Sequence, residues 1–332
     1  MPSITLPSGK EFAAQDGESL LDAALRAEVA LEYSCRTGRC SSCKAQVRSG
    51  STTALHPETG LSEAERAAGW ILSCVRSATS DVLLDVQDLG GVKLYPARTW
   101  PCRIQALQRL APDVLKVMLR LPPAADFGFQ PGQYVDLIGP GGVRRSYSVA
   151  NAPAADKLLE LHIREVPGGA LSSYWFGAAQ ANDLLRLHGP LGTFFLRGTA
   201  GMHLVFLATG TGIAPVKAML EALPSLPAAE QPASVTVYWG GRTEQDLYWR
   251  PEGAAAQACR FVPVLSRAGE GWSGTRGHVQ QALLADASEL SRTLVYACGS
   301  DAMIHGAREA LLAAGLPAQH FHSDAFVCSA PA

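Results

Sequence analysis

Four cysteines, Cys35, Cys40, Cys43 and Cys74, constrain the fold of this 332-residue chain more than any other feature. The first three follow the spacing C-x4-C-x2-C in the segment CRTGRCSSC, and the fourth lies 31 positions after Cys43. The loop also holds small residues, which let the backbone turn tightly; these are Gly38, Ser41 and Ser42. The chain is therefore expected to fold around a point where four sulfur atoms meet.

Four thiolates at this spacing are the ligand set of a plant-type [2Fe–2S] cluster. Structural zinc sites instead use paired C-x2-4-C knuckles, and the sequence offers no second pair, so zinc or plain buried thiols are less favoured. We predict that these four cysteines bind a [2Fe–2S] cluster. Three more cysteines are predicted to be ordinary thiols, namely Cys102, Cys259 and Cys328.

The composition is that of a soluble globular protein, with 47% hydrophobic and 17% charged residues. A chain of this length is expected to form two or three domains. It has no uncharged apolar run of membrane-spanning length, and its first residues, MPSITLPSGKEF, lack the features of a signal peptide. We therefore predict a cytoplasmic protein without a membrane span, in which clustered cysteines indicate metal binding rather than disulfides.

The net charge of −2 argues against a nucleic-acid partner, and the charge is unevenly distributed. Residues 1–88 hold 8 Lys and Arg against 12 Asp and Glu, whereas the remainder of the chain has a small positive excess. An acidic N-terminal region suits steering toward a basic patch on a partner or a neighbouring domain. A merely solvated acidic surface explains the same charge equally well.

Three domains are predicted. Residues 1–89 indicate an α+β unit with strands at 4–6, 11–13, 70–75 and 82–86, a helix at 19–28 capped by Ser19, and a short helix from Ser62. A Gly- and Pro-marked linker at 90–97 follows. Residues 98–200 carry short strands separated by Pro/Gly clusters, typical of a barrel or sandwich; these strands are 114–119, 134–138, 145–149 and 158–164.

Residues 201–332 alternate strands with helical stretches, which predicts a parallel α/β sheet. The expected strands are 203–208, 235–239, 260–264 and 293–297, and the expected helices are 215–223, 279–284 and 301–314.

The segment Arg145-Ser146-Tyr147-Ser148 lies on a predicted strand. Alternation along a strand places Arg145 and Tyr147 on one face and Ser148 on the other. A guanidinium beside an aromatic ring suits a ligand that has both a phosphate and a planar ring. An ordinary edge strand is the alternative.

The segment Gly169-Ala170-Leu171-Ser172 follows the strand that ends at Arg164. Ser172 is expected to cap a helix whose N-terminus faces a pyrophosphate.

Two further motifs follow predicted parallel strands. Gly210-Thr211-Gly212-Ile213-Ala214-Pro215 comes directly after the strand HLVFLA, where glycines let the backbone approach a pyrophosphate at a helix N-terminus. Cys298-Gly299-Ser300 ends the strand LVYA, and such strand ends hold the ligand chemistry of open α/β sheets. A purely structural glycine-rich turn would explain the first motif, and a buried structural cysteine would explain the second.

Taken in order, these motifs resemble the ferredoxin–NADP⁺ reductase superfamily with an N-terminal plant-type ferredoxin domain. Within it the chain looks most like CDP-6-deoxy-glucoseen reductases, also called CDP-6-deoxy-hexulose-3-dehydrase reductases. The closer likeness is carried by RRSYSVANAP at 144–153, GPLGTFF at 189–195, VYACGS at 295–300 and HSDAFV at 322–327. The resemblance implies a β-grasp ferredoxin domain, an antiparallel β-barrel that binds FAD, and an α/β domain that binds NAD(P).

The resemblance also implies site residues. Arg145, Tyr147 and Ser148 would bind FAD, with the Ser148 hydroxyl near flavin N5, and the nicotinamide would lie beside Cys298. Asp324-Ala325-Phe326 matches a C-terminal acidic-x-Phe motif, with Asp in place of the more usual Glu. The remaining candidate cofactor residues are Gly169 and Ser172 for FAD and Gly210, Thr211, Gly212, Pro215 and Gly299 for NAD(P). Arg242 is a further NAD(P) candidate from its position alone, after the second strand expected in the nucleotide domain.

The implied reaction carries electrons from NAD(P)H through FAD and the cluster to an acceptor protein. The resemblance favours NADH. The segment GGRTEQDLYW offers Arg242, which would suit the 2′-phosphate of NADPH, and also Glu244 and Asp246, which would suit a free ribose. A solvated surface arginine explains Arg242 equally well. The acceptor would be a pyridoxamine-phosphate-dependent sugar dehydratase or, alternatively, an oxygenase component. Two competing hypotheses are a non-catalytic redox sensor or electron carrier and a flavoprotein that reduces a small molecule.

Overall fold

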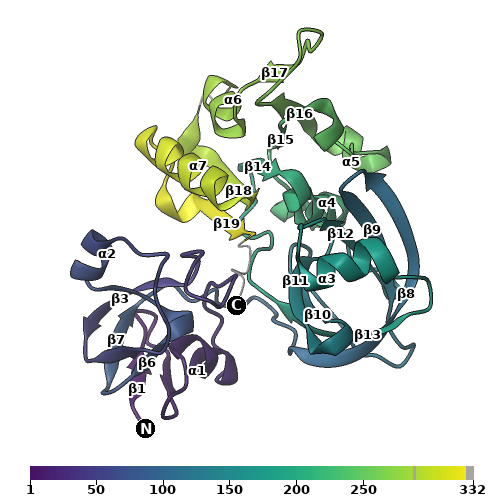
Figure 1. Cartoon of the computed structure of the whole chain (residues 1–332). Helices are drawn as coiled ribbons and strands as arrows, with labels where there is room; N and C mark the ends of the chain where they lie inside the picture. Colours follow the sequence, from purple (N-terminus) through teal and green to yellow (C-terminus); the bar gives the residue numbers. More distant parts are fainter. Residues whose placement is uncertain (287–288, 327–332) are drawn as a thin grey trace. The chain divides into compact units, whose positions relative to one another are not determined.

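The computed structural model describes residues 1–286 and 289–326. The described chain divides into two compact units (Figure 1). One unit comprises Met1–Leu94 with Gly192–Phe194, and the second comprises Tyr95–Leu191 with Phe195–Phe326. The first boundary falls between Leu94 and Tyr95, inside the linker expected at 90–97. The domain limits 1–89, 98–200 and 201–332 stay predictions.

The first unit contains a mixed five-stranded sheet with the order β2-β1-β7-β3-β5, in which β1 and β7 are parallel. Helix α1 buries its apolar face against the core, and Ser19 caps it as predicted by accepting a 3.0 Å hydrogen bond from the Asp22 N–H. The elements are β1 (Ser3–Thr5), β2 (Glu11–Ala13), α1 (Leu20–Arg26), β3 (Lys44–Ser49), β4 (Thr52–Ala54), α2 (Glu63–Ala67), β5 (Trp70–Leu72), β6 (Arg76–Ala78) and β7 (Val82–Asp85).

The strand expected at 70–75 was wrong beyond Leu72. The pairing of β5 with β3 ends with the Ser73 N–H, which donates to the Cys43 carbonyl at 3.1 Å, and Ser73–Val75 form a turn of 3₁₀ helix. This turn carries Cys74. The break in the strand therefore serves to bring the fourth cysteine to the first three.

The second unit begins with a six-stranded antiparallel sheet of order β11-β10-β13-β8-β9-β12. An antiparallel bridge between Val149 and Leu161 joins its two edge strands, so the sheet closes into the predicted barrel. Apolar side chains fill its interior, among them Val117, Leu161 and Ile163. The strands are β8 (Arg98–Ala111), β9 (Val114–Arg120), β10 (Tyr134–Ile138), β11 (Arg144–Ser148), β12 (Leu158–Arg164) and β13 (Leu184–Leu191).

A six-stranded parallel sheet completes this unit, with the order β17-β16-β15-β14-β18-β19. Figure 1 shows α6 and α7 on one face of this sheet and α4 and α5 on the opposite face. The strands are β14 (His203–Thr209), β15 (Ser234–Gly241), β16 (Arg260–Leu265), β17 (Thr275–Arg276), β18 (Thr293–Gly299) and β19 (Phe321–Ala325). The helices of the unit are α3 (Ala170–Ser173), α4 (Ile213–Ala222), α5 (Gly253–Ala258), α6 (Val279–Asp286) and α7 (Asp301–Ala313).

The strand order reverses at β14. The chain proceeds from β14 to β15, β16 and β17 on one side and then returns to place β18 and β19 on the opposite side. In open parallel sheets such a reversal leaves a crevice at the carboxyl ends of the two strands, where ligands bind. A ligand is therefore expected to bind at the residues that follow β14 and β18.

Candidate functional site

The three cysteines of the loop and Cys74 form two pairs. The Sγ atoms of Cys43 and Cys74 lie 3.2 Å apart, and the Cys35 N–H points at Cys40 Sγ at 3.4 Å. The hydrogen bond from Cys40, together with donors in the loop, lowers the pKa of the Cys35 thiol to about 5. In the second pair, the hydrogen bond from Cys43 lowers the pKa of Cys74. Each pair thus contains one sulfur that is disposed to ionise.

This donor set fits a binuclear cluster better than a single ion. Within the described ranges, no group of three or more His, Cys, Asp or Glu side chains is placed to hold one metal ion. A [2Fe–2S] centre needs two thiolates on each of two irons, and the two thiol pairs, Cys35 with Cys40 and Cys43 with Cys74, supply them. The residues present therefore match the cluster that the spacing predicts.

The backbone of the loop is tightly constrained. Gly38 has φ +75°, and a Cβ at this position would lie 2.5 Å from the Pro57 carbonyl oxygen. A larger residue is excluded on both grounds. The buried Glu58 lies beside the turn that carries Cys74. Its carboxylate accepts from the Leu72 N–H at 2.7 Å and from the guanidinium of Arg76 at 2.8 Å. Glu58 thereby holds the chain on both sides of that cysteine, a role that the sequence motifs do not indicate.

In the second unit, the loop after β14 meets the end of β18. A Cβ on Gly212 would lie 2.3 Å from the Cys298 carbonyl oxygen, so only glycine allows this approach. Gly210, Thr211 and Gly212 form a 3₁₀ turn that leads into α4, and Pro215 lies in the first turn of that helix. The loop thus presents its backbone at the reversal of strand order, where the GTGIAP motif was expected to bind a pyrophosphate.

Strand register brings three predicted residues together. Cys298 on β18 lies opposite Asp324 on β19, and the Cys298 Sγ is 4.0 Å from Asp324 Oδ2. Ser148, at the end of β11, donates its hydroxyl to the same Oδ2 at 3.5 Å. All three side chains are buried. Burial, followed by the neighbouring carboxylate, raises the pKa of Cys298 well above its usual value, so this residue remains a neutral thiol.

Phe326 follows Asp324 by two residues and lies beside the group formed by Ser148, Cys298 and Asp324. Its N–H donates to the Gly299 carbonyl at 2.8 Å, which fixes the backbone after β19 against the end of β18. Gly299 has φ +131°, and a Cβ there would lie 2.4 Å from the Thr209 hydroxyl oxygen. The C-G pair and the D-x-F segment are therefore parts of one structure, although 24 residues separate Gly299 from Asp324 in the sequence.

The predicted flavin motif lies on β11. The Tyr147 ring packs edge-on against Trp175, with ring centroids 6.5 Å apart, and its hydroxyl accepts a 3.2 Å hydrogen bond from the indole N–H. Burial raises the pKa of Tyr147 to about 12. Arg145 is exposed, and among the described residues no carboxylate pairs with it. An exposed guanidinium without a carboxylate partner is suited to a phosphate.

Ser172 does not cap a helix, so that prediction was wrong. Helix α3 starts at Ala170 with Gly169 in the N-cap position, and Ser172 lies inside it. The Ser172 hydroxyl accepts a 2.8 Å hydrogen bond from the Val166 N–H and so holds the preceding turn. A serine three residues after glycine was misread as the cap because glycine can itself occupy that position.

Arg242 faces a carboxylate. Its Nε and Nη2 lie 3.3 and 3.2 Å from the oxygens of Asp246, which also accepts from the Arg242 N–H at 2.8 Å. These contacts, with the hydrogen bond first, raise the pKa of Arg242. The structure therefore gives the predicted basic group an acidic partner directly after the second strand of the nucleotide domain.

Arg164, at the end of β12, is a candidate site residue that the sequence motifs do not include. Its Nη1 lies 3.4 Å from the position that a Cβ would take on Gly210. Its Nε and Nη2 are buried and donate no hydrogen bond within the described residues, although carboxylates of Asp113 and Asp246 lie 3.4 and 3.7 Å away. Buried guanidinium donors beside a glycine loop fit an anionic ligand such as a diphosphate.

The cysteines outside these sites that the structure describes, Cys102 and Cys259, have pKa values raised by burial. Cys102 is buried in the barrel, where burial raises its pKa to about 12, and burial also raises the pKa of Cys259. Cys328, also predicted to be an ordinary thiol, lies outside the described residues. None of the helices within 1–286 and 289–326 has the length and apolar character required to cross a membrane.

Comparisons with known proteins agree with this architecture. Residues 4–79 match the 2Fe-2S iron-sulfur cluster binding domain, residues 101–196 the oxidoreductase FAD-binding domain, and residues 206–309 the oxidoreductase NAD-binding domain. These matches confirm the predicted fold class and the three cofactors.

Whole-length relatives exist. The CDP-6-deoxy-L-threo-D-glycero-4-hexulose-3-dehydrase reductase of Yersinia pestis is 41% identical over 326 residues, covering 97% of each chain. The reductase component of the naphthalene 1,2-dioxygenase/salicylate 5-hydroxylase systems of a Ralstonia species is 32% identical, covering 98% of each. The crystal structure of a cytochrome P450 reductase from Amycolatopsis has a TM-score of 0.78 at 33% identity, covering 98% of this chain and 99% of that one.

These relatives span all three domains, and the loops described above carry the motifs of each. The chain therefore belongs to the ferredoxin–NADP⁺ reductase superfamily, as an NAD(P)H-dependent iron–sulfur flavoprotein reductase with an N-terminal plant-type ferredoxin domain.

Proposed function

We propose that this reductase oxidises NADH at the site where Ser148, Cys298 and Asp324 meet. It then delivers single electrons from the iron–sulfur cluster of the cysteine loop to an acceptor protein. The observation that carries the proposal is the convergence of these three buried side chains at the carboxyl end of a parallel sheet. A bound flavin supplies the chemistry of accepting a hydride and releasing its electrons singly. The protein supplies binding, orientation and exclusion of water.

Each residue has a proposed task. The Ser148 hydroxyl, oriented by Asp324, would hydrogen-bond flavin N5. The neutral Cys298 thiol and the half-buried Phe326 would line the nicotinamide pocket. On the flavin side, Arg145 would pair with phosphate and Tyr147 would stack on the ring, and Gly169 and Ser172 would shape the adjoining turn.

The coenzyme diphosphate is proposed to bind at the loop that starts at Gly210. Backbone N–H groups of this loop and the N-terminus of α4 favour an anion, and Arg164 adds buried donors beside the loop. Thr211, Gly212 and Pro215 would set the conformation of the loop, and Gly299 would line the coenzyme site next to it.

We propose NADH as the coenzyme. A 2′-phosphate at Arg242 would have to compete with the carboxylate of Asp246, which already accepts from that guanidinium. A carboxylate after the second strand suits a free ribose hydroxyl instead. NADPH is the alternative, and it would require Arg242 to leave Asp246.

The proposed acceptor is a pyridoxamine-phosphate-dependent sugar dehydratase that acts in 3,6-dideoxyhexose formation in the cytoplasm. The 41% identity with the Yersinia pestis reductase over nearly the whole chain supports this choice. An oxygenase component is the second candidate, because reductases of dioxygenase systems are also whole-length relatives.

An anaerobic titration tests the electron path. The purified holoprotein is titrated with NADH and, separately, with NADPH, while flavin absorbance and the EPR signal of the reduced cluster are followed. NADH is expected to bleach the flavin and then to produce the cluster signal, with NADPH slower. Failure of both nucleotides would contradict the proposed path and favour a sensor or carrier.

The acceptor is tested with the reduced protein. The reduced protein is mixed in one experiment with a pyridoxamine-phosphate-dependent CDP-sugar dehydratase and its substrate. In a second experiment it is mixed with an equal amount of an oxygenase component. The rate of cluster reoxidation is measured in both. Faster reoxidation by the dehydratase is expected. Faster reoxidation by the oxygenase component would support the second candidate, and equally slow reoxidation by both would contradict a protein acceptor of either kind.

A further inference from the structure

Three polar side chains share one face of β12, a strand whose opposite face lines the barrel core. Leu159, Leu161 and Ile163 point into the barrel, so alternation turns Glu160, His162 and Arg164 toward the parallel-sheet domain. Glu160 and His162 are nevertheless buried. Ionisable groups are rarely buried without partners, so this face must be matched by polar groups opposite.

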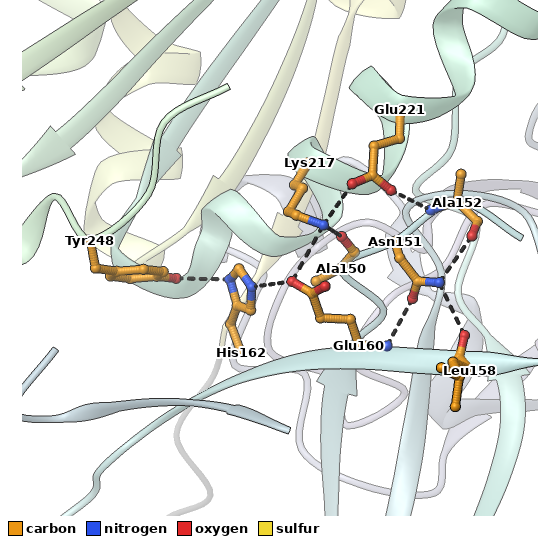
Figure 2. A network of polar contacts seen from close by, with 9 residues as sticks. All are labelled: Ala150, Asn151, Ala152, Leu158, Glu160, His162, Lys217, Glu221 and Tyr248. Carbon is orange, nitrogen blue, oxygen red and sulfur yellow. Dashed lines mark hydrogen bonds and ion pairs between the residues drawn. The ribbon is translucent and has the colours of Figure 1, made fainter. Parts of the chain in front are cut away.

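Lys217 on α4 supplies one such match (Figure 2). Its Nζ donates to the Ala150 carbonyl at 3.0 Å and lies 3.3 Å from Glu160 and 2.6 Å from Glu221. Ala150 is two residues beyond Ser148, and Lys217 is two residues beyond Pro215. One ammonium group thus connects the helix that follows the glycine loop with the end of the strand that carries Ser148.

His162 supplies the second match. Burial lowers its pKa, so the ring is neutral, donating from Nε2 to Glu160 at 2.8 Å and accepting the Tyr248 hydroxyl at Nδ1 at 3.2 Å. Tyr248 in turn packs edge-on against Trp239, with ring centroids 5.1 Å apart. The Trp239 indole N–H donates to the Gly210 carbonyl at 3.0 Å.

The contacts therefore form a continuous path from the glycine loop to the Ser148 strand. It runs from Gly210 through Trp239, Tyr248, His162, Glu160 and Lys217 to Ala150. Gly210, at one end, belongs to the proposed coenzyme diphosphate site. Ala150, at the other end, lies two residues beyond Ser148, which is proposed to hydrogen-bond flavin N5. Sliding α4 along β12 would separate buried charges from their partners, and breaking a buried ion pair is strongly unfavourable.

We propose that Glu160, His162, Lys217 and Tyr248 form a positioning network that sets the nicotinamide subsite against the flavin subsite for hydride transfer. The inference rests on the subsites assigned above. These residues touch neither reacting group and act through the loop and strand that they join. Hydride transfer depends steeply on the separation of donor and acceptor, and a misplacement of about 1 Å can cost about 100-fold in rate.

The test compares Lys217→Met with a matched control, Lys157→Met. Lys157, like Lys217, donates to backbone carbonyls, here those of Pro123 and Ala125 at 2.7 and 2.8 Å, but all three residues belong to the barrel domain. Stopped-flow measurements record the limiting rate of flavin reduction by NADH, its deuterium isotope effect with 4-deuterated NADH, and the long-wavelength absorbance of nicotinamide stacked on flavin. FAD content and melting temperature are recorded in parallel.

We expect Lys217→Met to retain FAD, to lower the limiting rate by about 10- to 100-fold, to raise the isotope effect and to weaken the long-wavelength band. Lys217→Arg, which keeps charge and donors, should recover most of the rate, and Lys157→Met should match the wild type. Tyr248→Phe removes one hydroxyl and leaves the ring on Trp239, so it is expected to give a smaller loss of the same kind even if Lys217→Met folds poorly.

Three outcomes would overturn the inference. The first is a Lys217→Met enzyme with wild-type limiting rate and absorbance. The second is a change confined to NADH affinity, and the third is a Tyr248→Phe enzyme indistinguishable from Lys157→Met. If the wild type itself is reduced by neither nucleotide, the proposed subsites fail as well, so the two failures are distinguishable.

Discussion

At the scale of single residues, Ser148 and Cys298 differ in what they can contribute, although both approach the same carboxylate oxygen. The thiol has a raised pKa and sits in full burial, which makes it an unreactive, neutral neighbour. The hydroxyl can donate to one acceptor and accept from another donor. Ser148 is therefore the member of the pair that can respond to a change of charge at a bound flavin.

We predict that Ser148→Ala slows flavin reduction while FAD stays bound. Loss of one oriented hydrogen-bonding group at a reaction centre raises a barrier by roughly 2.7–4 kcal/mol, or about 100- to 1,000-fold in rate. Stopped-flow bleaching by NADH measures the rate, and visible absorbance measures FAD content. Ser146→Ala is the control, because Ser146 lies on the same strand but is exposed and donates to Asp136. Equal rates in the two variants would contradict the role.

His322 on β19 predicts a pH dependence of stability. Burial, followed by the charge of Arg197, lowers its pKa to about 3, below the ordinary value near 6.5 of the unfolded chain. Between these pH values the unfolded state therefore binds more protons than the folded state. The contribution of His322 to the free energy of unfolding is fully present above pH 6.5 and declines as the pH falls. Between pH 6.5 and 5 the loss should be about 1–2 kcal/mol.

Urea unfolding at pH 6.5 and 5.0 measures this loss. His322→Asn places an amide oxygen where the ring nitrogen accepts from Arg197, and it should remove that part of the pH dependence. His305→Asn, at an exposed site on α7, should leave it unchanged. A pH dependence in His322→Asn equal to that of the wild type would refute the assignment.

At the scale of elements, the turn between β14 and α4 depends on one glycine. We predict that Gly212→Ala destabilises the protein by about 1–3 kcal/mol, because overpacking at a rigid backbone contact has this effect. The added Cβ would meet the Cys298 carbonyl and displace the loop, so NADH should bind roughly tenfold more weakly or worse.

Thermal melting and NADH titration of the FAD-loaded protein check this prediction. Gly306→Ala on α7 is the matched control, since its nearest neighbour would be the Gln280 amide nitrogen at an ordinary 3.5 Å. Alanine inside a helix should stabilise by about 0.5–1 kcal/mol at that position. Unchanged coenzyme affinity in Gly212→Ala would show that the loop tolerates displacement.

At the scale of the whole molecule, the cysteine loop and the nucleotide-binding sheet belong to different compact units. We predict that Cys74→Ser abolishes the cluster's absorbance and cytochrome c reduction, while NADH still reduces the flavin and ferricyanide at near wild-type rates. Cys259→Ser should have no effect on any of these activities. Loss of ferricyanide reduction in Cys74→Ser would show that the flavin site depends on the cluster unit.

Local patterns predicted much of this architecture. The apolar run at 203–208 and the motif glycines located β14 and its loop, because these features depend on neighbouring residues. The strand β8 was missed since its outward positions are polar and its sequence lacks a clean alternation. Contacts such as Glu160 with Lys217 could not be predicted, because only the closing of the barrel and the packing of α4 bring them together.

The order of the parallel strands has a consequence for how such an enzyme can be altered. The segments from β15 to β17 lie on one side of β14, while Cys298 and Asp324 come from β18 and β19 on the opposite side. Arg242 and Asp246, which are proposed to select the coenzyme, can therefore change without altering the residues proposed to face the nicotinamide. On this proposal, selection or a protein engineer can exchange the coenzyme that supplies the electrons while the residues proposed for the redox step stay unchanged.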